Sequence, residues 1–232
     1  MRVVSLVPSV TETLLAWGIR PVACTRFCEQ PDLPTVGGTK NPDLDAIVRI
    51  APDLVVMDEE ENRREDYEAL GARGVDVLAL AVRGLADVDP AMTRLAERTG
   101  ARWVPLGTGD APPLPGIDAF VPIWRRPYMA LGAPTYGTSV LARLSVANVA
   151  ARLGPYPTVT LEEMRAAGAK VVLAPSEPYR WRERHLSELR AVGPVVMVDG
   201  KDLFWWGART PAALTRLGTA LSPERLARAA AS

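Results

Sequence analysis

The stretch NPDLDAIVRIAPDLVVMDEE, residues 41–60, contains the pattern that decides the fold. Leu44, Ile47 and Val48 recur at helical spacing, Pro52 stops the helix, and the apolar run 54–57 follows. A short continuous apolar run of this kind is typical of a strand buried on both faces of a parallel sheet. We expect Asn41 to cap the helix, with Pro42 at its first position.

The same alternation extends to both sides of this stretch. Residues 3–7 read as a strand, and Ser9 with Glu12 forms the capping-box pattern of a helix that Gly18 ends. The charged residues 58–68 lead into a third helix that ends near Gly71, and residues 75–81 form a further strand. The first part of the chain therefore predicts a strand-helix-strand-helix-strand unit with a parallel sheet.

The second half of the chain repeats this pattern at a constant offset of 117 residues. Leu44 and Ile47 then fall on Leu161 and Met164, residues 54–57 on 171–174, and residues 75–81 on 192–198. A second capping box, from Thr160 to Glu163, opens the helix that contains Leu161. The offset predicts two similar lobes.

A helix at about residues 85–98 and the glycine- and proline-rich segment 107–116 separate the two halves. The second half opens with a strand at 117–124, a turn at 125–127 and a returning strand at 128–131. We expect an N-terminal α/β lobe at 1–83, a connecting helix and linker at 84–116, and a C-terminal α/β lobe at 117–232. The predicted fold class is α/β: two similar lobes with mostly parallel sheets, a single connecting helix, and a ligand cleft between the lobes.

Composition narrows the classes of function. The 232 residues are 48% hydrophobic, with 27 basic and 27 acidic residues, so a partner such as nucleic acid is not expected. No apolar run reaches the roughly 18 residues of a membrane span, so we expect no membrane insertion, and we expect a monomer. The N-terminus lacks the pattern of a signal peptide. The protein is extracytoplasmic if a signal was removed, and cytoplasmic if Met1 is the native start.

Residues with catalytic or metal-binding chemistry are scarce. The chain has two cysteines, Cys24 and Cys28, and one histidine, His185, too few for a disulfide framework or a zinc site. The glycine-rich and nucleophile motifs of nucleotide-binding enzymes and hydrolases are absent. We therefore expect a protein that is not an enzyme, without catalytic residues, a protein-held metal or an intrinsic cofactor. Any metal arrives inside a ligand.

Candidate ligand-binding residues follow from the layout of the strands. In parallel α/β lobes, ligands contact the loops beyond the carboxyl ends of the strands, because side chains and helix N-termini converge there. The candidates selected in this way are Ser9, Arg26, Phe27, Cys28, Thr39, Lys40, Glu60, Trp124, Arg125, Tyr136, Tyr179, Trp181, Trp205 and Trp206.

Aromatic residues are concentrated in the second half, with ten of fourteen from Phe120 onward. Large flat side chains at a binding site suit a broad, partly apolar ligand such as a corrin or porphyrin ring, although core packing explains any single tryptophan equally well. We expect Trp205 and Trp206 to lie on a strand, where one side chain packs inward and the other faces the ligand.

The chain resembles the substrate-binding proteins with a helical backbone that serve ABC importers of cobalamin, haem and ferric siderophores, and is most similar to the cobalamin-binding branch. The segments that carry the resemblance are RVVSLVPSVTETLLAWG (2–18), VGGTKNPDLDAIVRIAPDLVVMDEEENRRED (36–66), TYGTSVLARLSVANV (135–149), EPYRW (177–181) and DLFWWG (202–207).

This resemblance implies two lobes joined by one rigid helix, an ABC permease as partner, and corrin contacts from Thr39, Lys40, Trp124, Tyr136, Trp181 and Trp205. Carboxylates that dock to arginines of the permease would match Glu61 and Glu65 in the first lobe and Glu183 or Glu188 in the second. The connecting helix expected at about residues 85–98 is short for the family, since at 1.5 Å per residue it spans roughly 21 Å.

Two hypotheses follow from the sequence. The first is a non-enzymatic binding protein for a cobalamin-like or other metal chelate, such as haem or a ferric siderophore, that delivers its ligand to an ABC importer. The second is a cytoplasmic protein of the same fold that traffics or chemically processes a small ligand through Cys28, with Arg26 and Glu60.

Overall fold

The computed structural model describes residues 1–107 and 116–230, which form two compact units. Unit 1 comprises Met1–Val82, Ala86–Pro105 and the short segment Trp206–Arg209. Unit 2 comprises Arg83–Leu85 and the rest of the described chain. Most of the breaker-rich segment at 107–116 lies outside the described residues, so its role as a linker stays a prediction.

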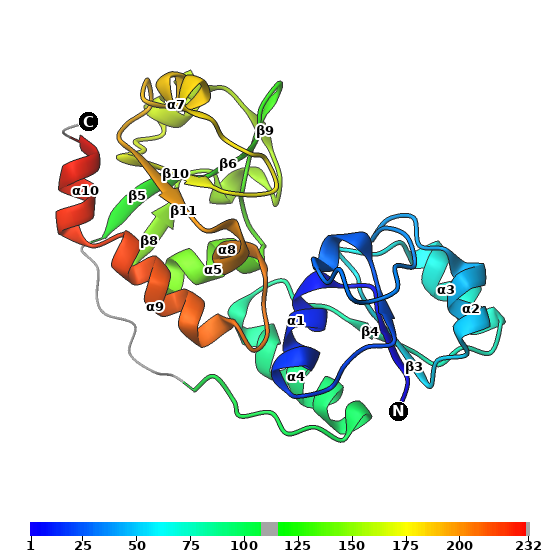
Figure 1. Cartoon of the computed structure of the whole chain (residues 1–232). Helices are drawn as coiled ribbons and strands as arrows, with labels where there is room; N and C mark the ends of the chain where they lie inside the picture. The colour runs from blue at the N-terminus through cyan, green and yellow to red at the C-terminus, as the bar shows by residue number, and fades with distance from the viewer. Residues whose placement is uncertain (108–115, 231–232) are drawn as a thin grey trace. The chain divides into compact units, whose positions relative to one another are not determined.

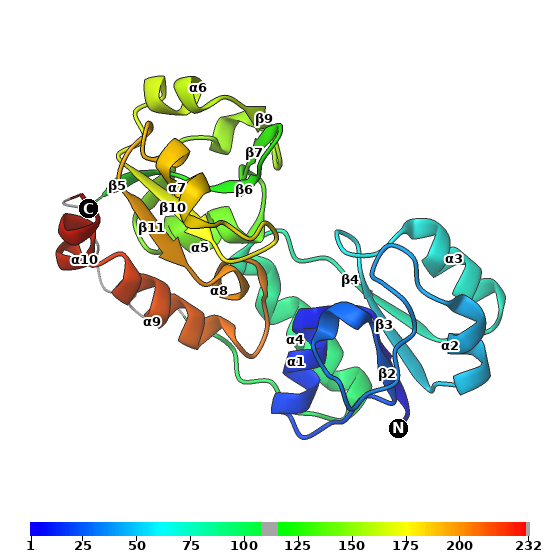
Figure 2. The same cartoon turned by 45° about the horizontal axis from the view of Figure 1, so that its top comes forward.

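Unit 1 is a parallel sheet with helices on both faces. Its strand order is β2 (Ala23–Cys24), β1 (Val3–Ser5), β3 (Leu54–Asp58) and β4 (Val77–Leu80). Figures 1 and 2 show α2 (Leu44–Ile50) and α3 (Arg64–Ala72) on one face of the sheet. Helix α1 (Pro8–Ala16) and most of the 15-residue α4 (Leu85–Thr99) cover the other.

Strand β3 is buried along its whole length, as the apolar run predicts. Its side chains pack on both faces of the sheet, and Ile47 from α2 and Leu70 from α3 close one side. Each of these apolar side chains contributes roughly 1.5–3 kcal/mol by leaving water. The helix-proline-strand pattern at 44–57 thus forms the centre of unit 1.

Unit 2 has a parallel sheet in the order β11 (Val195–Val198), β10 (Val171–Pro175), β5 (Ile117–Phe120) and β8 (Val146–Asn148). A small antiparallel sheet joins β6 (Pro122–Trp124), β7 (Tyr128–Ala130) and β9 (Thr158–Val159). The helices are α5 (Tyr136–Arg143), α6 (Leu161–Ala166), α7 (Glu183–Leu189), α8 (Gly200–Phe204), α9 (Thr210–Ala220) and α10 (Pro223–Ala230).

The predicted repeat is confirmed at the level of topology. The order β4-β3-β1-β2 in unit 1 matches the order β11-β10-β5-β8 in unit 2, and all of these pairs are parallel. The offset of 117 holds from β3 to β10 and grows by one at the edge strand, because Val55 pairs with Val77 whereas Val172 pairs with Val195. Two similar α/β lobes are therefore present.

Two of the predicted helix starts are wrong. Helix α1 begins at Pro8 with Val7 as its N-cap, so Ser9 lies in the first turn and makes no capping box; proline fits the first helical position, where its missing N–H is not needed. Helix α2 is capped by Asp43, whose carboxylate accepts from the backbone N–H of Ala46 at 2.8 Å. The bridge between Gly37 and Pro42 holds the preceding residues extended, so Asn41 is not the cap.

Other local predictions are confirmed or refined in unit 2. Thr160 and Glu163 form the predicted capping box of α6. The hairpin around residues 125–127 is present, but the strand expected at 117–124 is divided between two sheets as β5 and β6. Trp205 follows α8 as its C-cap instead of lying on a strand, so the strand predicted for residues 205–206 is wrong.

Candidate functional site

The turn after β3 holds a buried carboxylate at the carboxyl edge of the unit 1 sheet. Asp58 is 1% exposed, and its Oδ1 accepts from the backbone N–H groups of Glu60 at 2.9 Å and Glu61 at 3.4 Å. Its Oδ2 has no hydrogen-bond partner among the described residues. Burial raises the pKa of Asp58 to about 7, against the lowering effect of the two backbone donors. The turn is therefore built on a group that titrates near neutral pH.

Asn62 joins this turn to the neighbouring loops. Its amide Nδ2 donates to the carbonyl oxygens of Leu6 at 3.2 Å and Thr39 at 2.9 Å, and its Oδ1 accepts from the backbone N–H of Asp58 at 2.9 Å. The ammonium group of Lys40 donates to the carbonyl oxygen of Glu60. Thr39, Lys40 and Glu60, three predicted ligand residues, thus form one hydrogen-bonded assembly in which Lys40 and Glu60 are exposed and Thr39 is buried.

The loop after β2 presents an exposed cation and an exposed aromatic ring. The guanidinium of Arg26 lies 4.8 Å from the ring centroid of Phe27, which is 49% exposed, and donates to Asn41 Oδ1 at 3.5 Å. Cys28, which ends this loop, is buried at 2% exposed, and Ser9 in α1 is buried at 4% exposed. The burial of Cys28 argues against a thiol that a ligand reaches directly, and so against the hypothesis of ligand processing through Cys28.

Unit 2 contains an aromatic cluster made of Trp124, Tyr128, Tyr179, Trp181 and His185. Trp124 and Tyr179 meet edge to face with centroids 5.5 Å apart, and Tyr179 lies 4.7 Å from Trp181. Tyr128 lies parallel to Trp181 with centroids 6.3 Å apart, while His185 contacts both Tyr179 and Trp181. The cluster therefore runs from the buried Trp181 to Trp124, which is 46% exposed.

The aromatic cluster is assembled from two loops and a helix start. Trp124 ends β6 at the tip of the hairpin, Tyr179 and Trp181 lie in the loop after β10, and His185 lies in α7. Burial, with the charges of Arg125 and Arg184, lowers the pKa of His185, which keeps its ring neutral and suited to packing. The indole Nε1 of Trp181 is buried and has no partner in the described part of the chain.

A charged network beneath the hairpin fixes the aromatic cluster to α7. Arg125 donates from Nε and Nη2 to the two carboxylate oxygens of Glu188, at 2.9 and 2.5 Å, and the hydroxyl of Tyr128 donates to the same carboxylate at 2.6 Å. The bonds from Arg125 and Tyr128 lower the pKa of Glu188 to about 2. Arg125 is thus a positioning residue here, because its guanidinium is occupied within the unit.

Helix α8 directly follows β11, and Trp205 is its C-cap residue. Asp199 caps this helix, and the backbone N–H of Gly200 donates to Ser176 Oγ at 3.0 Å, which ties α8 to the loop after β10. Trp205 is half-buried, with the ammonium of Lys201 4.8 Å from its ring centroid. Trp206 is 5% exposed, so one of the two neighbouring tryptophans is buried and the other is partly accessible.

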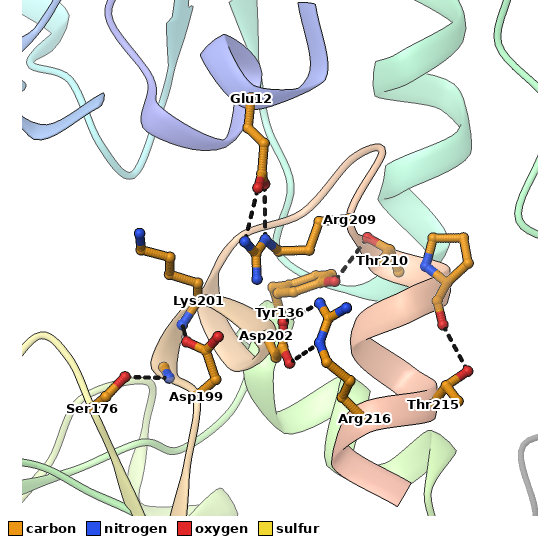
Figure 3. A network of polar contacts seen from close by, with 12 residues as sticks. Glu12, Tyr136, Ser176, Asp199, Lys201, Asp202, Arg209, Thr210, Thr215 and Arg216 are labelled. Atoms are coloured by element: carbon orange, nitrogen blue, oxygen red, sulfur yellow. Dashed lines mark hydrogen bonds and ion pairs between the residues drawn. The ribbon is translucent and has the colours of Figure 1, made fainter. Parts of the chain in front are cut away.

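Tyr136 lies inside unit 2, where it is 4% exposed and its hydroxyl pairs with Thr210 Oγ1 at 2.9 Å (Figure 3). The same region is held by two bonds from Arg216 to the buried Asp202, at 2.6 and 2.7 Å, which join α8 to α9. Tyr136 and Asp202 therefore support the loop that carries Trp205.

The four predicted docking carboxylates differ in their surroundings. Glu61 and Glu65 are exposed on unit 1, and Glu183 is exposed while pairing with Arg190 at 2.9 Å. Glu188 is occupied by Arg125 and Tyr128. Of the two alternatives in the second lobe, Glu183 is the accessible carboxylate.

Sequence reasoning missed three residues that organise these loops: Asn62, Tyr128 and Asp58 as a buried group. Tyr128 could have been found, because it directly follows the hairpin turn that carries Trp124 and Arg125. Asn62 gives no local signal, since its partners Leu6 and Thr39 are distant in sequence.

Among the described residues, no three histidine, cysteine, aspartate or glutamate side chains lie close enough to hold a metal ion. No described helix is both long and apolar enough to cross a membrane.

Comparisons with known proteins agree with this architecture. Residues 3–103 match the family model described as periplasmic binding protein. A search of curated proteins gave no match. Among solved structures, the periplasmic vitamin B12 binding protein BtuF of Vibrio cholerae is 20% identical with a TM-score of 0.75, covering 95% of this chain and 96% of that one.

Two haem-binding proteins are similar to the same extent. The periplasmic haem-binding protein BhuT, solved with two haems, is 22% identical with a TM-score of 0.79, covering 97% of this chain and 98% of that one. A periplasmic haem-binding protein from Pseudomonas aeruginosa is 20% identical with a TM-score of 0.76, covering 96% and 92%. Residues 3–103 are thus similar to the periplasmic binding protein family, and the likeness to these solved structures shows that the chain has their two-lobed fold.

Proposed function

We propose that this chain is the substrate-binding component of an ABC importer and that its ligand is a flat metal chelate of the cobalamin or haem class. The observation that carries the proposal is the aromatic cluster that ends in Trp124, at the carboxyl-terminal loops of unit 2. An exposed indole held edge to face by Tyr179 offers a rigid apolar surface for a tetrapyrrole ring. Similar folds that bind vitamin B12 or haem support the same ligand class.

The accessible residues at the loop edges divide into apolar and charged contacts. On unit 2, Trp124, Tyr179 and Trp205 would contact the ring; on unit 1, Phe27 is the exposed aromatic candidate. Arg26 and Lys40 supply positive charge, which suits the carboxylates of a porphyrin or the phosphate of a cobalamin. The buried candidates would hold the accessible residues in place by packing against their loops. They are Ser9, Cys28, Thr39, Tyr136, Trp181 and Trp206.

The proposed setting is outside the cytoplasm, with an ABC permease as partner. Glu61 and Glu65 on unit 1 and Glu183 on unit 2 are the exposed carboxylates that would meet arginines of the permease. Exchanging Glu65 and Glu183 for glutamine should leave ligand affinity unchanged and reduce transport by the reconstituted importer.

A titration of the purified protein tests the ligand class. Haemin, cyanocobalamin and a ferric hydroxamate siderophore are added separately while tryptophan fluorescence is followed, because a bound chromophore quenches a contacting indole. We expect saturable quenching by haemin or cyanocobalamin, and no saturation with all three ligands would overturn the proposal.

A matched pair of variants locates the site. Trp124→Leu removes the exposed ring of the aromatic cluster, and we expect it to weaken binding by about tenfold, equivalent to about 1.4 kcal/mol. Trp17→Leu is the control, because Trp17 packs on Trp103 at 6.1 Å and follows the end of α1 that is remote from the loops. Equal losses in both variants would contradict a site at Trp124.

A further inference from the structure

The two cysteines lie together beneath the loop that presents Arg26 and Phe27. Cys24 ends β2, Thr25 is extended, and the 3-10 turn η1 (Arg26–Cys28) closes as the backbone N–H of Cys28 donates to the carbonyl of Thr25 at 3.1 Å. The chain thus folds back between the two thiols. Cys24, Cys28 and Leu33 form one buried cluster, and both cysteines are free.

The surroundings of the two sulfurs differ, and the difference favours ionisation of Cys28. Hydrogen bonds from the Cys24 thiol and from the hydroxyls of Thr11 and Thr25, both 3.2 Å from Cys28 Sγ, lower the pKa of Cys28. The hydrogen bond with Cys28, together with burial, raises the pKa of Cys24. Cys28 is therefore the thiol that would attack first, because the thiolate is the nucleophile in disulfide exchange.

We propose that Cys24 and Cys28 are a redox pair that closes as an intramolecular disulfide by exchange with a small disulfide such as oxidised glutathione. The Cys28 thiolate attacks one glutathione sulfur, and the first glutathione leaves as a thiolate. Cys24 then loses its proton and attacks the Cys28 sulfur of the mixed disulfide, which releases the second glutathione. The protein loses two electrons and two protons, and one glutathione disulfide becomes two thiols.

The proposed bond would fix the segment that carries two proposed ligand contacts. Arg26 and Phe27 lie between the bonded residues, so closing the bond would restrict the turn that presents the cation and the ring. Because both cysteines are at most 2% exposed, exchange requires the turn to open, and we expect it to take minutes to hours. The effect on ligand binding rests on the proposed function, whereas the disulfide itself does not.

Peptide mapping of the full-length protein tests the bond directly. The protein is equilibrated in glutathione buffers of increasing oxidised fraction, quenched in acid, alkylated with N-ethylmaleimide and digested with trypsin without reduction. Trypsin cleaves after Arg26 and Lys40 but not between Arg20 and Pro21, so Cys24 and Cys28 separate into peptides 3–26 and 27–40. We expect these two peptides to be joined, with a mass two hydrogens below their sum.

A second arm asks whether the fold brings the thiols together. The same series in urea gives the tendency of the unfolded segment, and we expect the native protein to close at a ratio of oxidised to reduced glutathione about tenfold lower. Separate peptides carrying maleimide or glutathione in every native sample, or a bond that forms only in urea, would overturn the proposal. If haemin and cyanocobalamin fail to bind while the peptides are joined, only the proposed function fails.

Discussion

At the scale of single residues, Asp58 makes the stability of unit 1 depend on pH. Its pKa is about 7 in the folded protein against the ordinary value of 3.8, so the folded state keeps a proton that the unfolded chain has lost between these values. The free energy of unfolding therefore falls as pH rises through this window. The neighbouring charges of Glu60 and Glu61 act in the same direction, since they also disfavour the ionised carboxyl.

The variant Asp58→Asn keeps the acceptor for the turn and removes the titration. We expect its free energy of unfolding, relative to that of the unchanged protein, to rise between about pH 4 and about pH 7, by at most about 4 kcal/mol at 1.4 kcal/mol per pKa unit. Urea denaturation at about pH 5 and about pH 8 measures the difference. Parallel pH profiles for the two proteins would show that Asp58 is already ionised in the folded state.

Replacing two glycines by alanine should change the stability of the protein in opposite directions. A Cβ at Gly132 would lie 1.9 Å from the carbonyl oxygen of Gly154, whereas a Cβ at Gly71 in α3 would meet nothing within 4 Å. We expect Gly132→Ala to destabilise the protein by about 1–3 kcal/mol, and Gly71→Ala to stabilise it by about 0.5–1 kcal/mol through helix propensity. Thermal unfolding measures both, and a stabilising Gly132→Ala would contradict the close approach.

The residues that sequence reasoning could find are those whose roles depend on near neighbours. Trp124 and Lys40 were predicted as loop candidates from the expected strand ends, and both are exposed in the structure. Burial of Ser9, Cys28 and Tyr136 could not be predicted, because it depends on contacts such as that between Tyr136 and Thr210, 74 residues apart. Pattern thus selects the loop, and tertiary packing decides which side chain of the loop is exposed.

At the scale of elements, the capping box of α6 shows how far local sequence determines a helix start. Thr160 Oγ1 accepts from the backbone N–H of Glu163 at 3.1 Å, and Glu163 Oε2 accepts from the backbone N–H of Thr160 at 2.7 Å. All the partners lie within four residues, so the motif was predictable. The start of α2 was not predictable from the capping pattern alone. The bridge between Gly37 and Pro42 keeps Asn41 outside the helix, and the cap is Asp43 instead.

Removing the Thr160 cap of α6 should lower the stability of unit 2. We expect Thr160→Ala to lower the free energy of unfolding by about 1 kcal/mol, because the backbone N–H of Glu163 loses its acceptor. Glu162→Ala is the matched control, since Glu162 is exposed in the same turn and lies outside the capping box. Urea denaturation compares the three proteins, and an equal loss in both variants would contradict a specific role for the capping box.

At the scale of the whole molecule, the repeat was the most predictable feature because it is read from periodicity alone. The offset of 117 residues places β3 on β10 and the start of α2 on that of α6. It does not report the division of residues 117–124 between two sheets or the return of Trp206–Arg209 to unit 1. That segment is held there by Arg209, which donates two hydrogen bonds of 2.8 Å to Glu12, a contact across 197 residues (Figure 3).

Ligand binding should appear in the stability of the folded chain, because a ligand that binds only the folded state raises the free energy of unfolding by mass action. At a free ligand concentration 100 times the Kd, the increase is about 2.7 kcal/mol, or roughly 5–10 °C in Tm for a chain of this size. We expect haemin or cyanocobalamin to produce such a shift. Trp124→Leu should keep a ligand-free Tm close to that of the unchanged protein, since Trp124 is 46% exposed. At the same ligand concentration a tenfold weaker Kd should leave about half of the shift. A variant that lost ligand-free stability but kept the full shift would place the binding surface away from the aromatic cluster.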